Sequence, residues 1–127
     1  MASDTKNFKV NEFACKCGCG KSDIDQRVMN MAQKLRDDLG VPVKVNSGCR
    51  CAKHNAKVGG VKGSNHTLGL AADLSSSVGA AKMFEAVQKL QKAGELPELR
   101  YCIYYAKKNF IHIDCGKERK NLFEIRK

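Results

Sequence analysis

The sequence lacks several features that define whole classes of protein. It has no Trp, only two Pro and no long polar tract, so its composition is not that of a disordered or fibrous chain. No apolar run approaches the roughly 20 residues that cross a bilayer. The opening residues, MASDTKNFKVNEF, contain no apolar core of a secretory signal. We therefore expect no transmembrane segment and synthesis in the cytoplasm.

A length of 127 residues is too short for two ordinary domains and sufficient for one, because domains most often contain roughly 100 to 150 residues. The balance of 43% hydrophobic and 28% charged residues is typical of a globular domain. We expect a single domain over residues 1–127, present as a monomer.

Basic residues outnumber acidic ones, with 23 Lys and Arg against 13 Asp and Glu, which gives a net charge of +10. A field of this sign attracts anionic partners such as nucleic acid, anionic lipid or cell-wall polymers. A nucleic-acid surface also needs aromatic side chains among its basic ones, and here Phe and Tyr are not interleaved with Lys and Arg. We therefore expect no nucleic-acid partner. The alternative interpretation of the excess Lys is a solubilising surface.

Two segments have the apolar spacing of amphipathic helices. Residues 24–39 repeat apolar side chains at helical intervals, with Asp23 or Ser22 as a possible N-cap and Gly40 as the end. Residues 79–93 carry a similar apolar stripe. Both helices are expected to pack that stripe into the core.

Five segments have the pattern of strands. Residues 41–46 alternate apolar and polar side chains, and the sequence LAADL at residues 70–74 resembles a short buried strand. The C-terminal third, with RYCIYY, FIHIDCG and NLFEIRK, predicts a meander of three more. Helices that alternate irregularly with antiparallel strands indicate an α+β fold, with helices packed on a small antiparallel sheet.

Two of the three His residues stand in contexts that suit a metal ligand. His66 lies in SNHTLGLAAD, where a turn at Gly69 lets the chain double back and bring Asp73 beside the imidazole. His112 lies in FIHIDCG, where strand alternation puts it on the same face as Asp114 and opposite the apolar positions. His66, Asp73 and His112 could then converge on one cation.

Two imidazoles and one carboxylate suit a catalytic zinc, because three protein ligands leave the fourth tetrahedral position for water. A closed structural site would use four protein ligands. Each His taken alone is better interpreted as an ordinary polar surface or turn residue, and it is the combined pattern that favours the metal.

The sequence around these residues resembles a known family. Ser64, His66, Gly69, Ala71 and Asp73 match the S-x-H-x-x-G-x-A-x-D signature of the zinc D-alanyl-D-alanine carboxypeptidases and L-alanyl-D-glutamate peptidases, which share the Hedgehog-like fold. The similarity extends from NEFACKCGCG through SGCRCAKHNAKVGG to FIHIDCG. It is greatest to the short phage and prophage members.

This resemblance implies a hydrolase that cleaves peptide bonds in peptidoglycan stems. It implies a zinc ion held by His66, Asp73 and His112, and an arginine, here Arg50, that steadies the polarised carbonyl or binds substrate. It also implies the role of a bacteriophage endolysin, which accumulates in the cytoplasm and degrades the cell wall after release. A basic surface suits that role, because the bacterial envelope is anionic.

The general base is the part of the motif that departs from the family. Many members carry an acidic residue three positions before the last histidine, and here that position is Asn109. Asp114 is the remaining candidate for a catalytic base, since it shares a strand face with His112. Alternatively, Asp114 orients a ligand histidine or binds Arg50. Ser64 either hydrogen-bonds substrate or closes the turn before His66.

Seven cysteines are an odd number, so a complete set of internal disulfides is impossible. Cys15, Cys17 and Cys19 alternate along the chain, and adding Cys51 would supply four thiolates for a second, structural zinc. The C-x-C-x-C spacing is less typical of such a site than C-x-x-C.

Two other functions compete with the peptidase. The first is a catalytically weak or inactive zinc-bound recognition domain, like the Hedgehog signalling domain, that binds cell-wall peptide or a protein partner; the missing acid before His112 supports it. The second is a small Cys-rich basic module that uses a structural zinc and binds nucleic acid. This alternative leaves His66, Asp73 and His112 unexplained.

Overall fold

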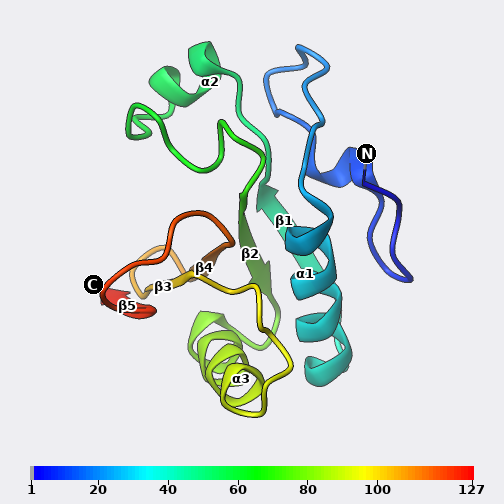
Figure 1. The fold of residues 1–127 in the computed structure, drawn as a ribbon, viewed down its shortest axis with the longest axis vertical. Coiled ribbons are helices and arrows are strands. Elements are labelled where there is room, and N and C mark those ends of the chain that lie inside the picture. The colour runs from blue at the N-terminus through cyan, green and yellow to red at the C-terminus, as the bar shows by residue number, and fades with distance from the viewer. Residues whose placement is uncertain (1) are drawn as a thin grey trace.

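A computed structural model describes residues 2–127. Its elements form a five-stranded sheet with helices against it, which confirms the α+β class (Figure 1). In chain order they are the 3-10 turn η1 (Val10–Phe13), α1 (Gln26–Leu39), β1 (Val43–Ser47), α2 (Ala52–Lys57), β2 (Ala71–Ser76), α3 (Ala80–Lys92), β3 (Tyr101–Tyr105), β4 (Phe110–Asp114) and β5 (Phe123–Arg126). No helix within these residues is both long and apolar enough to span a membrane.

The sheet has the strand order β1-β2-β4-β3-β5. The pairs β1·β2, β2·β4 and β3·β4 are antiparallel, as expected, but β5 pairs with β3 in parallel, so the sheet is mixed. The expected three-stranded meander is therefore wrong in its last strand. β4 is already paired with β2 on one side and β3 on the other, so β5 cannot pair with it. β4 ends at Asp114, opposite the start of β3, and β5 begins beside the start of β3 as well. The chain therefore enters β5 beside Cys102 and runs in the direction of β3.

The two long helices lie close to their expected positions. α1 begins two residues later than expected, because Asp25 is the N-cap and accepts a hydrogen bond from the N–H of Arg27 at 2.9 Å. It ends at Gly40, whose φ of 69° is the left-handed conformation that glycine adopts most easily. The N-terminus of α3 is capped from a distant part of the chain, since the Asn109 side chain accepts a hydrogen bond from the N–H of Ala80 at 2.8 Å.

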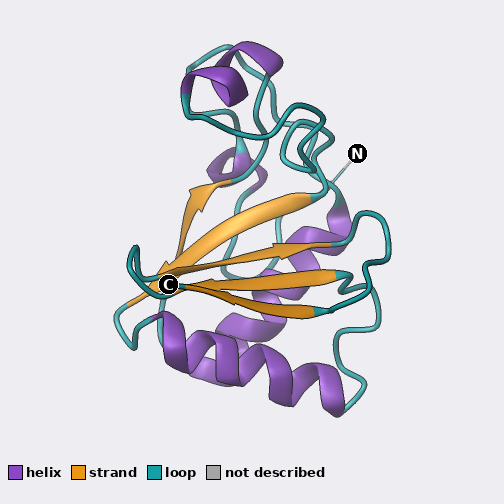
Figure 2. Ribbon diagram, turned by 90° about the vertical axis from the view of Figure 1, so that its left-hand side faces the viewer, coloured by secondary structure: helices purple, strands orange, loops and turns teal. Residues whose placement is uncertain are grey.

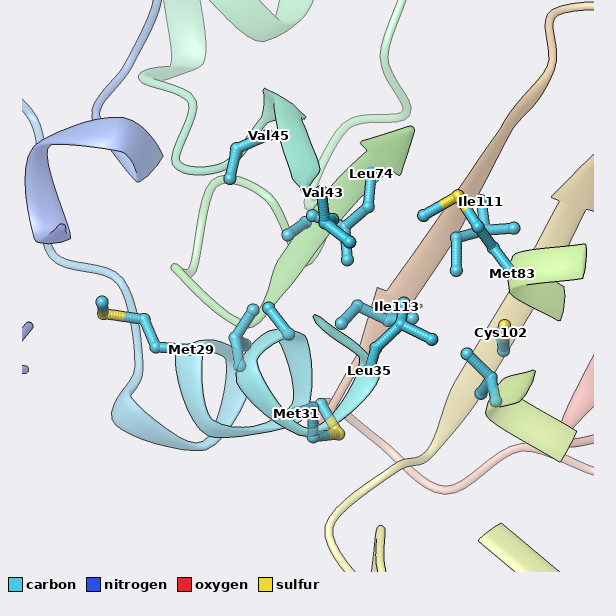
Figure 3. Close-up of a cluster of buried hydrophobic side chains, with 14 of the residues drawn as sticks. Met29, Met31, Leu35, Val43, Val45, Leu74, Met83, Cys102, Ile111 and Ile113 are labelled. Carbon is cyan, nitrogen blue, oxygen red and sulfur yellow. The ribbon is translucent and has the colours of Figure 1, made fainter. Parts of the chain in front are cut away.

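One face of the sheet packs on α1 and α3 (Figure 2). Alternate residues of the strands point into this layer, where they meet the apolar stripes of the helices (Figure 3). Buried members of this core from both sides are Met31, Leu35, Leu74, Met83, Cys102, Ile111 and Ile113. The residues between them on the strands necessarily face the other way, and this second face carries the candidate site.

We expect Leu35→Ala to lower the free energy of unfolding by about 2 to 5 kcal/mol, because Leu35 is 1% exposed and its truncation leaves a cavity between α1 and the sheet. Urea denaturation followed by circular dichroism measures this. Leu68→Ala, at a side chain that is 59% exposed, is the control and should change the value by less than about 0.5 kcal/mol. Equal effects of the two substitutions would contradict the packing of Leu35 between α1 and the sheet.

Candidate metal centre

The site lies on the sheet face that the helices leave open. Cross-strand register aligns one residue from each strand in a single row: Ser47 opposite Asp73, Asp73 opposite His112, His112 opposite Ile103, and Ile103 opposite Glu124. Side chains opposite one another in neighbouring strands share a face and lie within contact. Strand pairing alone therefore brings Asp73 and His112 together, as the alternation of the sequence predicts.

His66 reaches the same point from a loop. Its carbonyl oxygen accepts hydrogen bonds from the N–H groups of Arg50 at 3.0 Å and Gly69 at 3.3 Å, which closes the turn before β2. Gly69 has a φ of 71°, and a Cβ there would lie 2.2 Å from the carbonyl oxygen of Asp23. Only glycine fits this position, so the turn that was expected to fold His66 back onto Asp73 depends on it.

Two imidazole nitrogens meet the Asp73 carboxylate. His66 Nε2 lies 3.3 Å and His112 Nδ1 lies 3.0 Å from Asp73 Oδ1, and the ligand atoms of the three residues lie within 4.8 Å of one another. His66 Nδ1 is 2.7 Å from the Gly48 carbonyl oxygen, which can only accept. In the neutral ring the proton is therefore on Nδ1, and the Nε2 lone pair faces Asp73. This donor set fits a zinc ion.

Asp114 binds the opposite edge of the His112 ring. Its Oδ2 lies 2.7 Å from His112 Nε2, and its side chain is 1% exposed. Burial alone lowers the pKa of His112, but hydrogen bonds to Asp114 and Asp73 outweigh burial and raise that pKa to about 9. Burial raises the pKa of Asp73, but its hydrogen bonds to His112 and His66 hold it far below the usual value. The His112 ring is therefore held between the two carboxylates, with Nδ1 facing Asp73 and Nε2 facing Asp114.

Arg50 completes the charged cluster. Its guanidinium donates from Nη2 to Asp73 Oδ2 at 3.3 Å, from Nε to Ser47 Oγ at 3.1 Å and from Nη1 to Asn55 Oδ1 at 3.2 Å. The Arg50 side chain is only 14% exposed, so these three acceptors hold it in one orientation beside the carboxylate. The sequence predicted Arg50 at this place but not its anchor Asn55, which lies in the short helix α2.

A comparison with protein-family models gives a match to the model described as Peptidase M15 over residues 6–114. The chain belongs to the peptidase M15 family. The resemblance drawn from the His66 motif is thereby confirmed, and the matched range contains the whole His-Asp-His group and Asp114. This family consists of zinc peptidases, so the chain has the framework of a hydrolase. Among curated proteins, none matches the chain.

A cleft of about 460 Å³ is lined in part by His66, Asp73 and His112 of this M15 protein, the three residues that could hold a metal and that we call the metal-ligand group. Ser64 lines it, and its Oγ also accepts a hydrogen bond from the N–H of His66 at 3.2 Å, so Ser64 both closes the turn and faces the cleft. Aromatic side chains form part of the wall, and basic side chains surround it. These lining residues are Tyr101, Tyr105 and Phe110 with Lys108, Arg119 and Arg126.

Sequence reasoning missed several of these residues. Tyr101 was detectable, because strand alternation places it on the face of His112, and their rings lie 6.1 Å apart. Arg126 was not, because its position depends on the parallel pairing of β5. Asn109, at the position where the resemblance leads us to expect an acid, occupies the β3–β4 turn with a φ of 58° and caps α3. Its side chain is therefore engaged outside the cleft.

The structure also brings together the four cysteines that the sequence grouped. Ligand atoms of Cys15, Cys17, Cys19 and Cys51 lie within 4.8 Å of one another, so this M15 protein has a second group of side chains that could hold a metal. All seven cysteines are free thiols, and the other three, Cys49, Cys102 and Cys115, are buried.

In the metal-free protein, Asp114→Asn should lower the pKa of His112, because it removes the anionic acceptor at Nε2 that favours the charged ring. An NMR titration of the imidazole signals measures this pKa. Asp37→Asn makes the same chemical change at an exposed position of α1 and should leave the His112 pKa unaltered. An unchanged titration of His112 in Asp114→Asn would show that the two side chains do not interact.

Proposed function

We propose that the protein is a zinc metallopeptidase that hydrolyses peptide bonds in the stem peptides of bacterial peptidoglycan. The observation that carries this proposal is the convergence of His66, Asp73 and His112 in the lining of a cleft, with Arg50 beside them. Family membership supports a zinc peptidase in general.

His66 Nε2, Asp73 and His112 Nδ1 would hold the zinc ion. When bound by three protein ligands, zinc keeps a position for water, lowers the pKa of that water to roughly 7 and polarises a carbonyl. The protein contributes ligand orientation. Gly48 holds the His66 ring through Nδ1, and Asp114 holds the His112 ring through Nε2, so the nitrogen that faces Asp73 is set in both rings.

Asp114 is assigned to positioning rather than to proton transfer. It is fully buried and lies at the edge of the His112 ring away from Asp73. A general base must lie within hydrogen-bond reach of the proton that it removes. Of the three roles that the sequence left open, the contact with His112 favours orientation of a ligand. Binding to Arg50, the third possibility, is taken instead by Asp73.

Arg50 is assigned to the substrate. A guanidinium that is already anchored can donate to a carboxylate or to the oxygen that becomes negative during hydrolysis, without losing side-chain freedom at that moment. Its fixed position next to Asp73 places this charge beside the proposed metal. Ser64, at the cleft wall, is the proposed hydrogen-bond partner of the peptide backbone.

The charge of the cleft supports an anionic substrate. Lys108, Arg119 and Arg126 lie around it, while the carboxylates that line it are Asp73 and Asp114, both engaged with His112. Stem peptides carry free carboxylates, and the bacterial envelope is anionic, so a chain of net charge +10 is attracted to the wall. We propose an endolysin-like role in which the protein acts on the wall after release.

Digestion of purified peptidoglycan tests the proposal. Zinc-loaded wild type should release stem-peptide fragments that mass spectrometry identifies, whereas His112→Ala should release none, because it removes a ligand. Lys82→Ala, an exposed change on α3, is the matched control and should match wild type. If wild type releases no fragment from Gram-negative or Gram-positive walls, the enzyme proposal is wrong and a zinc-bound recognition domain becomes the better description.

Arg50→Lys should lower kcat/KM on a stem peptide by roughly 10² to 10³, because a lysine keeps the charge but not the anchored donors that face the developing oxyanion. Arg27→Lys changes an exposed arginine of α1 in the same way and should leave kcat/KM as in wild type. Steady-state kinetics with both variants measures the difference. If Arg50→Lys has the same kcat/KM as wild type, the proposed role of Arg50 in binding the substrate is wrong.

A further inference from the structure

Two segments that are distant in sequence meet at one end of the molecule, away from α1 and α3. One follows η1 and carries Cys15, Cys17 and Cys19; the other precedes α2 and carries Cys51 (Figure 1). The Sγ atoms of Cys15 and Cys17 are 3.4 Å apart, those of Cys17 and Cys51 are 3.6 Å apart, and those of Cys15 and Cys51 are 3.9 Å apart.

These distances are those of a tetrahedral metal site. Four sulfurs at about 2.3 Å from a central zinc ion lie about 3.8 Å from one another. A disulfide would instead need about 2.05 Å between two sulfurs. Hydrophobic burial does not explain the cluster either, because Cys17 and Cys19 are exposed. Three of the sulfurs therefore have the spacing of thiolates around one ion, and Cys19 Sγ lies within 4.8 Å of them.

Backbone groups support thiolates at this place. The N–H of Cys51 donates to Cys15 Sγ at 3.4 Å, and the N–H of His54 donates to Cys51 Sγ at 3.3 Å. Hydrogen bonds to an ionised acceptor are stronger than those to a neutral one, so these donors favour the charged, metal-binding form of sulfur. The same His54 contact makes Cys51 the N-cap of α2, which explains how the ligand is oriented.

We propose that Cys15, Cys17, Cys19 and Cys51 bind a second zinc ion, which fastens the segment after η1 to the loop that carries Arg50. Four protein ligands leave no position for water, so this zinc is structural rather than catalytic. Soft thiolates suit zinc better than they suit magnesium or calcium. The remaining cysteines, Cys49, Cys102 and Cys115, are buried with the core and are not ligands.

The consequence for the cleft follows from chain connectivity. Cys51 is the residue after Arg50, and the N–H of Cys49 already donates to the carbonyl oxygen of Phe13 at 2.8 Å. A Cβ at Gly48 would lie 2.5 Å from that same oxygen, so the two segments are in direct contact. A zinc ion at the cysteines would hold both sides of this contact and keep the Arg50 backbone at its place beside Asp73.

Metal analysis of the full chain, purified under reducing conditions, tests the site. Wild type should contain about two zinc ions per chain, and Cys17→Ser and Cys19→Ser should each contain about one. Both cysteines are exposed, so these changes leave the core intact. Lys16→Ser, at the exposed residue between Cys15 and Cys17, is the matched control and should retain the wild-type content. His112→Ala should lose the other ion only.

Cobalt substitution identifies the ligands independently of activity. The thiolate-to-cobalt charge-transfer band should persist in His112→Ala and be lost in Cys19→Ser. A wild type with one zinc ion, unchanged in Cys17→Ser and Cys19→Ser, would overturn the proposal, as would a Cys15–Cys51 disulfide found by mass spectrometry in the freshly reduced and zinc-supplied protein. If instead the proposed catalytic zinc site is wrong, the zinc content per chain will be the same in His112→Ala as in wild type.

Discussion

The antiparallel pairing of β2 with β4 is the constraint on which the site depends. It sets Asp73 opposite His112, and because side chains alternate between faces, a shift of one residue would turn one of the two into the apolar layer against α1 and α3. The buried positions Ala72, Leu74 and Ile111 oppose such a shift, since it would expose them. Burial of these apolar residues thus fixes the register of β2 and β4, and that register keeps Asp73 beside His112.

Charge balance explains how so polar a group is tolerated at buried positions of the sheet. Asp73 is 7% exposed, and an isolated carboxylate there would be costly. Arg50 and the two imidazoles offset that cost. Asp114 pairs with Nε2 of His112, the ring nitrogen that does not face Asp73. Such a cluster contributes little net stability compared with an apolar one of the same size. Its three ligand atoms lie close enough together that they could hold a cation.

Much of the site could be predicted because its signals are local. The spacing from His66 to Asp73 includes the Gly69 turn, and strand alternation assigned His112 and Asp114 to one face. The grouping of Cys51 with the three earlier cysteines rested on chemistry alone, and the folded chain brings them together. By contrast, α2 was not foreseen, because a helix of six residues has too few apolar positions for a periodicity to be seen.

The sequence by itself determined the α+β class, the two amphipathic helices and the grouping of His66, Asp73 and His112, which could hold a metal, because periodicity and motif spacing are properties of neighbouring residues. Only the tertiary structure decided that β5 runs parallel to β3, that Asp114 faces the far edge of His112, and that Asn109 caps α3 instead of entering the cleft. The direction of β5 and the Asn109 cap depend on which sheet edge or helix end is free when the chain returns, and the orientation of the His112 ring depends on its contact with Asp73 of β2. All three are set by contacts between segments distant in sequence.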